Sequence, residues 1–360
     1  MNMTIISSNW YLPHYRARFA RLANWLSLAF TMGLTSTNAM ADTTNIKLQR
    51  LAANPLLTTA SSPVLGNNVN GPSVIRVPDW IKAPLGKYYM YFAHHKGKNI
   101  RLAYANEITG PWTVHEPGTL QLEDSFFPTG VIPLDGLPEA IQKRVSEARA
   151  EGDDPLYTHI ASPDVVVVPE REEIRLYYHG MQSSGAQASR VAVSSDGITF
   201  RAREEVIARP YLRVFNWDNQ VYGMAMPGVF YRSPDGLTGF EEGPSLFNRD
   251  MRHAALVIRG QTLYVFWTQV GDAPEQILLS TIDLSGDWHT WQASPPIPVL
   301  KPEHDWEGAN LPVVPSVRGA IEVPVNQLRD PAIFEENGRT WLFYSIQGES
   351  GIGIAEVKGL

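Results

Sequence analysis

The sequence contains no cysteine, which excludes a disulfide framework, a thiolate metal site and a cysteine nucleophile. It also lacks a run of basic residues, and its net charge of −7 is spread along the chain, which argues against a nucleic-acid partner. A glycine-rich phosphate loop, a Gly-x-Ser-x-Gly elbow and a His-Glu-x-x-His helix are absent as well. Stability must therefore come from a hydrophobic core.

Only the N-terminus has a long apolar run. Leu22 to Leu34 follows a region with three arginines and precedes the small-x-small sequence of residues 39–41. This order is typical of a secretory signal peptide, and the run is too short to span a bilayer comfortably. We expect residues 1–41 to be removed and residues 42–360 to form one secreted or periplasmic domain. A retained membrane anchor is the alternative.

Four stretches of the chain repeat one pattern: an aromatic strand, a polar hairpin and a second short strand. The aromatic strands are expected at residues 87–92, 174–178, 262–267 and 340–344, and the second strands at residues 100–104, 190–193, 276–279 and 351–355. Short antiparallel strands that recur with almost no helix between copies are typical of a β-propeller. The pattern predicts one blade for each copy.

The spacing of the copies predicts a fifth blade. The gap between the second and third copies is about twice a blade long, and it contains the weaker strand pattern of residues 221–231 and a turn at 233–236. We therefore predict an all-β, five-bladed β-propeller with loop insertions on the cleft side. Residues 138–152 are predicted to form an inserted helix, and the proline-rich residues 294–325 to join blades four and five.

Residues 329–344, which begin Arg-Asp-Pro, carry a resemblance to a known group of enzymes. They resemble the blade opening of five-bladed propeller glycoside hydrolases, namely families 43, 62 and 117 and, more distantly, 32, 68 and 130. In those enzymes an Asp-Pro begins the innermost strand of a blade. Weaker copies occur at residues 71–75 and 162–166. The resemblance covers the expected mature chain and implies a glycosidase fold.

The chain departs from the catalytic pattern of family 43. That pattern places a general-base Asp in the first blade, a second Asp in the second and an acid Glu in the third. The corresponding positions here carry Gly71, Ser162 and residues 224–226, which are Met-Ala-Met. The family's three carboxylates therefore do not carry over. The sequence predicts a divergent branch in which Asp330 is the best remaining carboxylate at a blade opening.

Polar residues gather where strands are expected to return to the cleft. If Asp330 begins an inner strand at the cleft, the next strand runs back, so its end and hairpin lie on the same face. Titratable groups that converge in one concavity indicate a binding site. The predicted substrate-binding residues are Asn70, His94, His95, His159, His179, Arg252, Gln269, Arg329 and Gln347.

Hydrolysis of a glycosidic bond normally needs two carboxyl groups with separated pKa values. We predict Asp330 as the base and Glu349 as the acid, because burial would raise the pKa of Glu349. Asp164 and Glu307 are the next candidates. His253 is a rival acid, since the resemblance extends to family 117, which is thought to use a histidine in that role.

Each of these residues also has a structural interpretation. Asp330 could cap a loop or pair with Arg329, and a lone histidine is often satisfied inside a core. The tryptophans outside the strands (Trp80, Trp217 and Trp306) could be sugar platforms or packing residues. No cofactor is expected to be required, and His and Gln side chains on the propeller axis could hold a structural Ca²⁺.

Two functions follow. The first is a secreted or periplasmic glycoside hydrolase acting on a plant or algal oligosaccharide, exo-acting and inverting. The second is a propeller that binds carbohydrate without cleaving it. Two carboxyl groups across one pocket at about 5–10 Å would favour the first. The sugar, its linkage and the oligomeric state are left open by the sequence.

Overall fold

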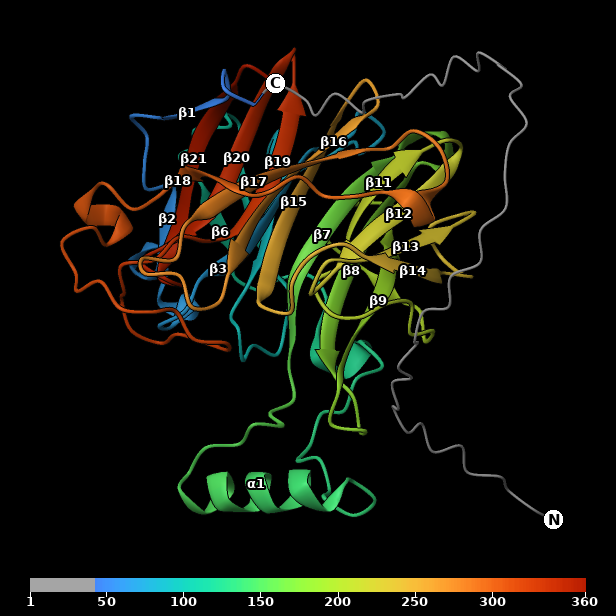
Figure 1. Ribbon diagram of the computed structural model, residues 1–360, viewed down its shortest axis with the longest axis vertical. Helices are drawn as coiled ribbons and strands as arrows, with labels where there is room; N and C mark the ends of the chain where they lie inside the picture. Colours follow the sequence, from blue (N-terminus) through green and yellow to red (C-terminus); the bar gives the residue numbers. More distant parts are fainter. Residues whose placement is uncertain (1–42) are drawn as a thin grey trace, which may run out of the picture. The chain divides into compact units, whose positions relative to one another are not determined.

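The computed structural model describes residues 43–360, and the predicted signal peptide lies outside the described residues. In the described part, antiparallel sheets form the five blades of a β-propeller (Figure 1). The predicted fold is thereby confirmed. No helix in residues 43–360 is long and apolar enough to cross a membrane.

Three blades come from the first part of the chain, and each runs in order from the inner to the outer strand. Blade I contains β3 (Asn70–Arg76), β4 (Tyr88–Ala93), β5 (Arg101–Ala105) and β6 (Thr113–His115). Blade II contains β7 (Ile160–Val168), β8 (Glu173–Met181), β9 (Gln187–Ser194) and β10 (Arg201–Ala202). Blade III contains β11 (Arg213–Trp217), β12 (Gln220–Ala225), β13 (Val229–Ser233) and β14 (Glu241–Ser245).

The C-terminal part of the chain builds the remaining two blades. Blade IV contains β15 (Met251–Arg259), β16 (Thr262–Gln269), β17 (Ile277–Asp283) and β18 (Ile297–Leu300). Blade V contains β19 (Arg329–Glu336), β20 (Arg339–Ile346) and β21 (Gly351–Lys358). The short 3₁₀ helices are η1 (Thr59–Ser61), η2 (Pro63–Leu65), η3 (Leu122–Asp124), η4 (Pro169–Arg171), η5 (Trp288–Thr290) and η6 (Asp305–Glu307).

The beginning of the described chain completes blade V. β1 (Lys47–Arg50) pairs along the outer edge of β21, and β2 (Leu57–Thr58) pairs with the other end of the same strand. The propeller ring is therefore closed by strands from opposite ends of the sequence. The sequence analysis did not predict this closure, because Lys-Leu-Gln-Arg has none of the aromatic residues that mark the other strands.

The aromatic strands are the second strands of their blades, as the repeat predicts. β4, β8 and β20 are almost entirely buried, because side chains on both faces pack against neighbouring blades. For example, Tyr91 contacts Phe200 edge to face, and its hydroxyl donates to the backbone oxygen of Gly197. The weaker pattern of residues 221–231 forms β12 and part of β13, so blade III is confirmed.

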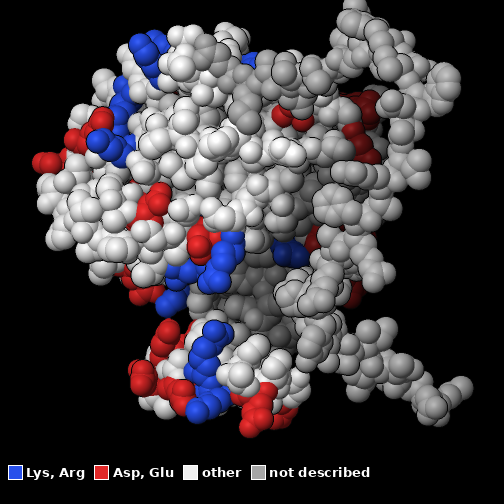
Figure 2. Space-filling view, in the orientation of Figure 1, with Lys and Arg blue, Asp and Glu red and all other residues white. Residues whose placement is uncertain are grey.

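The helical insert is α1 (Glu139–Ala150), which agrees with the predicted range. Val145 of α1 packs in a small cluster with Ile132, Leu137 and Met181, and this cluster attaches the insert to the end of β8. The other residues of α1 are half-buried or exposed, and the helix carries charges of both signs, as the lower part of Figure 2 shows.

The range predicted for the proline-rich insert was wrong at its beginning. Residues 297–300 form β18, the outer strand of blade IV, so only the chain after Leu300 connects blades IV and V. Proline at position 298 is tolerated because β18 is an edge strand. The connection then includes η6 and a stretch without helix or strand that reaches β19.

Candidate functional site

Three inner strands begin with the same backbone irregularity. The register of β3, β7 and β19 shifts close to the start of each strand, and Gly71, Ser162 and Asp330 have positive φ angles of 62°, 51° and 48° there. Positive φ is uncommon for residues other than glycine and is a form of strain found at functional sites. The same backbone shape thus presents no side chain, a hydroxyl and a carboxylate in blades I, II and V.

Asp330 is paired with His253 of the neighbouring blade IV. Its Oδ1 lies 2.7 Å from His253 Nδ1, and both side chains are at most 3% exposed. The hydroxyl of Ser345 donates to Asp330 Oδ2 at 2.9 Å, and the backbone N–H of Gly71 donates to Ser345 at 3.3 Å. Both oxygens of Asp330 are therefore occupied. The ring atom left without a partner is the buried His253 Nε2.

The charges of this pair follow from burial and from the contact itself. Burial raises the pKa of Asp330, but the neighbouring His253 outweighs this, so the pKa lies below its ordinary value and the carboxylate is ionised. Burial lowers the pKa of His253 by more than Asp330 raises it, so the imidazole is neutral near pH 7. With its proton on Nδ1 beside Asp330, the ring has a lone pair on Nε2 and can accept a proton there.

A second group of charges centres on Arg329, which is fully buried. Its Nη1 donates to Glu349 at 2.9 Å, and its Nε lies 2.9 Å from Glu275 Oε2. Arg252 Nη1 lies 3.3 Å from the same oxygen of Glu275. Buried charges that are paired in this way avoid most of the cost of an isolated buried ion. We call Asp330, His253, Glu349, Arg329 and Glu275 the central cluster.

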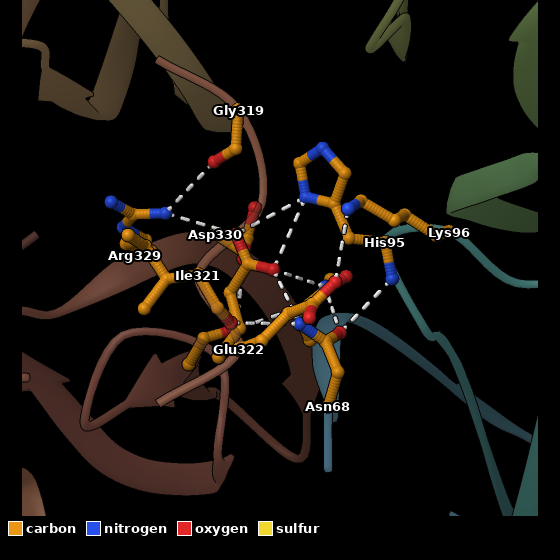
Figure 3. Close-up of polar contacts among 12 residues, drawn as sticks. Asn68, His95, Lys96, Gly319, Ile321, Glu322, Arg329 and Asp330 are labelled. Carbon is orange, nitrogen blue, oxygen red and sulfur yellow. Dashed lines mark hydrogen bonds and ion pairs between the residues drawn. The ribbon is translucent and has the colours of Figure 1, made fainter. Parts of the chain in front are cut away.

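Glu349 receives several donors besides Arg329. The side-chain amides of Asn68 and Asn70 lie 2.7 and 3.1 Å from Oε2, and His95 Nδ1 lies 3.1 Å from Oε1 (Figure 3). Burial alone would raise the pKa of Glu349, but His95, Arg329 and Asn68 outweigh it and hold the pKa well below its ordinary value. The raised pKa expected from the sequence was therefore wrong, and these donors keep Glu349 ionised.

Residues 316–322 of the connection between blades IV and V, here called the covering segment, lie on the central cluster. Three of its backbone carbonyls accept hydrogen bonds from Arg252, Arg329 and Asn68, at 3.1, 3.3 and 3.0 Å from Val317, Gly319 and Ile321, respectively. Figure 3 shows Gly319 and Ile321 beside Arg329, Asp330 and Asn68. The sequence predicts loop insertions on the cleft side, and the structure places part of this insert over the charged groups.

A row of ring contacts links the predicted histidines. The centroid distances along it are 6.5 Å for His95–Tyr157, 4.7 Å for Tyr157–His159, 5.4 Å for His159–His179, 4.4 Å for His179–Tyr211 and 4.5 Å for Tyr211–His253. His159 Nε2 and His179 Nδ1 are buried without partners. Burial lowers the pKa of His159 to about 4 and that of His179 well below its ordinary value, so both rings are neutral at pH 7.

Two predicted catalytic carboxylates have structural contacts instead. Asp164 accepts a hydrogen bond from the backbone N–H of Val214 at 2.8 Å and lies 3.6 Å from Arg213, so it connects blades II and III. Glu307 is fully buried and accepts from Arg50 at 2.7 Å and from Tyr344 at 3.0 Å. These contacts do not support the predicted catalytic roles, because the carboxylates are engaged away from the central cluster.

Three predicted binding residues make their hydrogen bonds outside the central cluster. His94 Nε2 contacts Asn67 at 3.3 Å, Gln269 contacts Asn248 at 2.9 Å, and Gln347 donates to the backbone oxygen of Asp305 at 3.1 Å. The other predicted binding residues belong to the contacts described above: Asn70, His95, His159, His179, Arg252 and Arg329.

The sequence analysis missed Glu275, Asn68, Tyr211 and Ser345. A signal for Glu275 was present, because Glu275 and Glu349 each stand two residues before the third strand of their blade. No pattern in the sequence marks Tyr211. Only the folded chain shows that it has a positive φ of 62° and that its ring lies between those of His179 and His253.

Residues 43–360 contain no group of three or more His, Cys, Asp or Glu side chains arranged to hold a metal ion. Calcium prefers carboxylate and carbonyl oxygens, whereas the carboxylates of the central cluster are engaged by arginine and histidine donors. The donor set therefore does not fit a Ca²⁺ ion at this cluster. The cofactor prediction itself stays a prediction.

Comparisons with known proteins give one relative in sequence and several in fold. An uncharacterized protein of Acanthamoeba polyphaga mimivirus is 34% identical over 352 residues, which cover 89% of this chain and 93% of the viral protein. No family model matches the sequence.

The solved structures with a similar fold are much more distant in sequence. A family 43 β-xylosidase/α-arabinofuranosidase from a compost microbial metagenome, solved with xylotriose, is 15% identical, with a TM-score of 0.53 over 86% of this chain and 94% of that one. A structure from the GH130 family of mannoside phosphorylases, which contains hydrolases that target β-1,2 mannosidic linkages in Candida mannan, is 10% identical, with a TM-score of 0.58 over 88% and 95%. The chain therefore belongs to the family of the mimivirus protein, and it has the five-bladed propeller fold of family 43 glycoside hydrolases.

Proposed function

We propose that this protein is a glycoside hydrolase that cleaves O-glycosidic bonds in an oligosaccharide. The observation that carries the proposal is the 2.7 Å contact between Asp330 and His253, together with the unpartnered Nε2 of the same ring. A histidine that is oriented by a carboxylate and has one free nitrogen is a proton-transfer group. Its place at the start of the inner strands matches the predicted cleft face, and the resemblance in fold makes glycoside hydrolysis the first reaction to test.

In the proposed reaction the base is His253 rather than Asp330, the base predicted from the sequence. His253 Nε2 takes a proton from a water molecule as the water oxygen attacks the anomeric carbon. Asp330 keeps the ring in the required tautomer and stabilises the imidazolium that forms. The bond between the anomeric carbon and the leaving oxygen breaks, the leaving oxygen takes up a proton from solvent water, and the imidazolium of His253 returns its proton to solvent. Direct attack by water inverts the anomeric configuration. Glu349 is ionised and does not hold a proton at neutral pH, so we do not assign the second proton transfer to it.

The finer parts of the proposal concern substrate and place of action. The covering segment closes one side of the central cluster, which favours a pocket over an open groove and hence exo-action. We propose plant or algal oligosaccharides as the substrates, and pentose oligosaccharides are the first to test because the compost enzyme was solved with xylotriose. A secreted or periplasmic location and removal of residues 1–41 are part of the same proposal.

The test is a release assay on the full chain with aryl glycosides and plant and algal oligosaccharides. Asp330→Asn removes the charge but keeps the shape, and it should abolish release without changing the melting temperature greatly. Asp135→Asn, at an exposed position, is the matched control and should keep full activity. Equal rates in the Asp330→Asn variant and the wild type would contradict the proposal.

A second candidate function is carbohydrate binding without cleavage. It is favoured by Glu349 and Glu275, which are held by Arg329 and Arg252 as a structural ion pair network would hold them. Under this proposal no substrate is released, whereas binding of oligosaccharides persists in both the wild type and Asp330→Asn.

A further inference from the structure

A separate cavity of about 240 Å³ lies beside the hairpin between β20 and β21. Its walls come from four parts of the chain: the segment containing Thr58, the loop at Asn67, the connection between blades IV and V, and the hairpin itself. Its polar and aromatic lining residues include Asn67, Trp306, Glu322, Gln347 and Ser350. No residue of the central cluster lines this cavity.

Along three chain segments, wall residues of the cavity are nevertheless close in sequence to Glu349 or to a residue bonded to Asn68, its hydrogen-bond donor. Gln347 and Ser350 line the cavity, while Glu349 between them belongs to the central cluster. Asn67 lines it, while the next residue, Asn68, donates to Glu349 at 2.7 Å. Glu322 likewise follows Ile321 of the covering segment. The wall of the cavity and the surroundings of Glu349 are therefore built from neighbouring residues of the same segments.

The chemistry of the wall fits a neutral, hydroxyl-rich ligand. It offers two amides, hydroxyl groups, one carboxylate and part of an indole, and no lysine or arginine is among its lining residues. Amides, hydroxyls and carboxylates can donate to or accept from sugar hydroxyl groups, which are donors and acceptors at once. The cavity is smaller than the roughly 300–1,000 Å³ of pockets for drug-sized ligands. Its size therefore suits one sugar ring.

Among residues 43–360, Glu322 has one ionic partner that would compete with a ligand. Lys96 Nζ lies 3.1 Å from Glu322 Oε1, and the two side chains are 35% and 45% exposed. An exposed pair of this kind is weak, so ligand hydroxyls can replace or share it.

We infer that this cavity is a carbohydrate subsite that binds one neutral sugar ring of an oligosaccharide whose next ring reaches the central cluster. The class of ligand rests on the proposed function. The position of the subsite does not, because it follows from the cavity and its wall.

The test is calorimetric titration of the full chain with xylotriose, arabinotriose and β-1,2-mannobiose. The double variant Asn67→Ala/Glu322→Ala removes two exposed polar groups from the wall and should fold normally. At about 1 kcal/mol for each of the two lost hydrogen bonds, the affinity for the sugar that binds should fall by about thirtyfold. The matched control Asn106→Ala/Glu147→Ala changes the same residue types at exposed positions elsewhere and should bind like the wild type.

Three outcomes separate this inference from the proposed function. Binding that the wall variant weakens and the control keeps would support the subsite, whether or not any sugar is cleaved. Hydrolysis of a probe with equal affinity in the wild type and the wall variant would overturn the subsite and keep the hydrolase. Absence of binding for all three probes at millimolar concentration would overturn the subsite as well.

Discussion

Blade V and blade II begin with the same backbone shape but present different chemistry. Asp330 and Ser162 both have positive φ and lie in a register shift near the start of an inner strand. Asp330 contacts His253 of blade IV, whereas Ser162 lies beside Tyr211, whose ring centroid is 4.5 Å from that of His253. The register shift thus holds the side chain of one residue in the same place at the start of each of these inner strands. The type of that residue decides whether the blade supplies a charge there. The residues of the central cluster accordingly come from blades IV and V.

The largest effect is expected when blade V receives the residue that blade II has at the equivalent position. Asp330→Ser should lower the rate of hydrolysis by about 10³–10⁴, because His253 loses the carboxylate that fixes its tautomer and stabilises its protonated form. Initial rates on a substrate found in the release assay measure this. Ser162→Gly is the matched change in blade II and should alter the rate far less. Similar losses in both variants would show that the two positions act alike.

The buried arginine should matter for stability more than any exposed charge. Arg329→Met leaves Glu275 and Glu349 without their common partner, and breaking a buried pair costs roughly 3–5 kcal/mol of unfolding free energy. Urea unfolding followed by circular dichroism measures this. Arg76→Met breaks the 2.6 Å pair with Glu336 at a position where Arg76 is 50% exposed, and it should cost at most about 1 kcal/mol. Equal costs would contradict the assignment of Arg329 as a buried structural charge.

The buried histidines in the row of ring contacts predict a loss of stability at mildly acidic pH. His159 has a pKa of about 4 in the folded protein because it is buried, against an ordinary value of 6.5. Between these values the unfolded state binds a proton that the folded state does not, so stability falls as the pH falls from 6.5 to 4. The contribution of His159 is on the order of 3 kcal/mol.

Unfolding free energies of the wild type and His159→Gln between pH 8 and 4 check this prediction. The variant should have a flatter profile over the window from 6.5 to 4, with little difference in slope between pH 7 and 8. A steeper fall in the variant would contradict a neutral, buried His159.

The sequence predicted the blades because strands buried on both faces need large apolar and aromatic side chains at regular intervals. It failed for β1, which lies at an outer edge of blade V and needs no such residues. Asp330, His253 and Glu349 could be found because they lie at the start of an inner strand or in a hairpin of the repeated pattern. The roles of Asp164 and Glu307 could not, because their partners Arg213 and Arg50 are far away in sequence and only the folded chain brings them together.

The smallest effect concerns the backbone shape itself and is tested in blade I. Gly71 has a φ of +62°, and a Cβ added there would lie 3.5 Å from Ser162 Cα, an ordinary contact. Gly71→Ala should therefore cost only the strain of a left-handed backbone, roughly 1–2 kcal/mol of unfolding free energy. Gly130→Ala is the control, because a Cβ at Gly130 meets nothing within 4 Å and its φ is not in this region. Urea unfolding compares the two variants. If Gly71→Ala lowers the unfolding free energy no more than the control does, the backbone at this position relaxes readily. The positive φ shared by Gly71, Ser162 and Asp330 would then be set by the residues themselves and not by the packing of the blades.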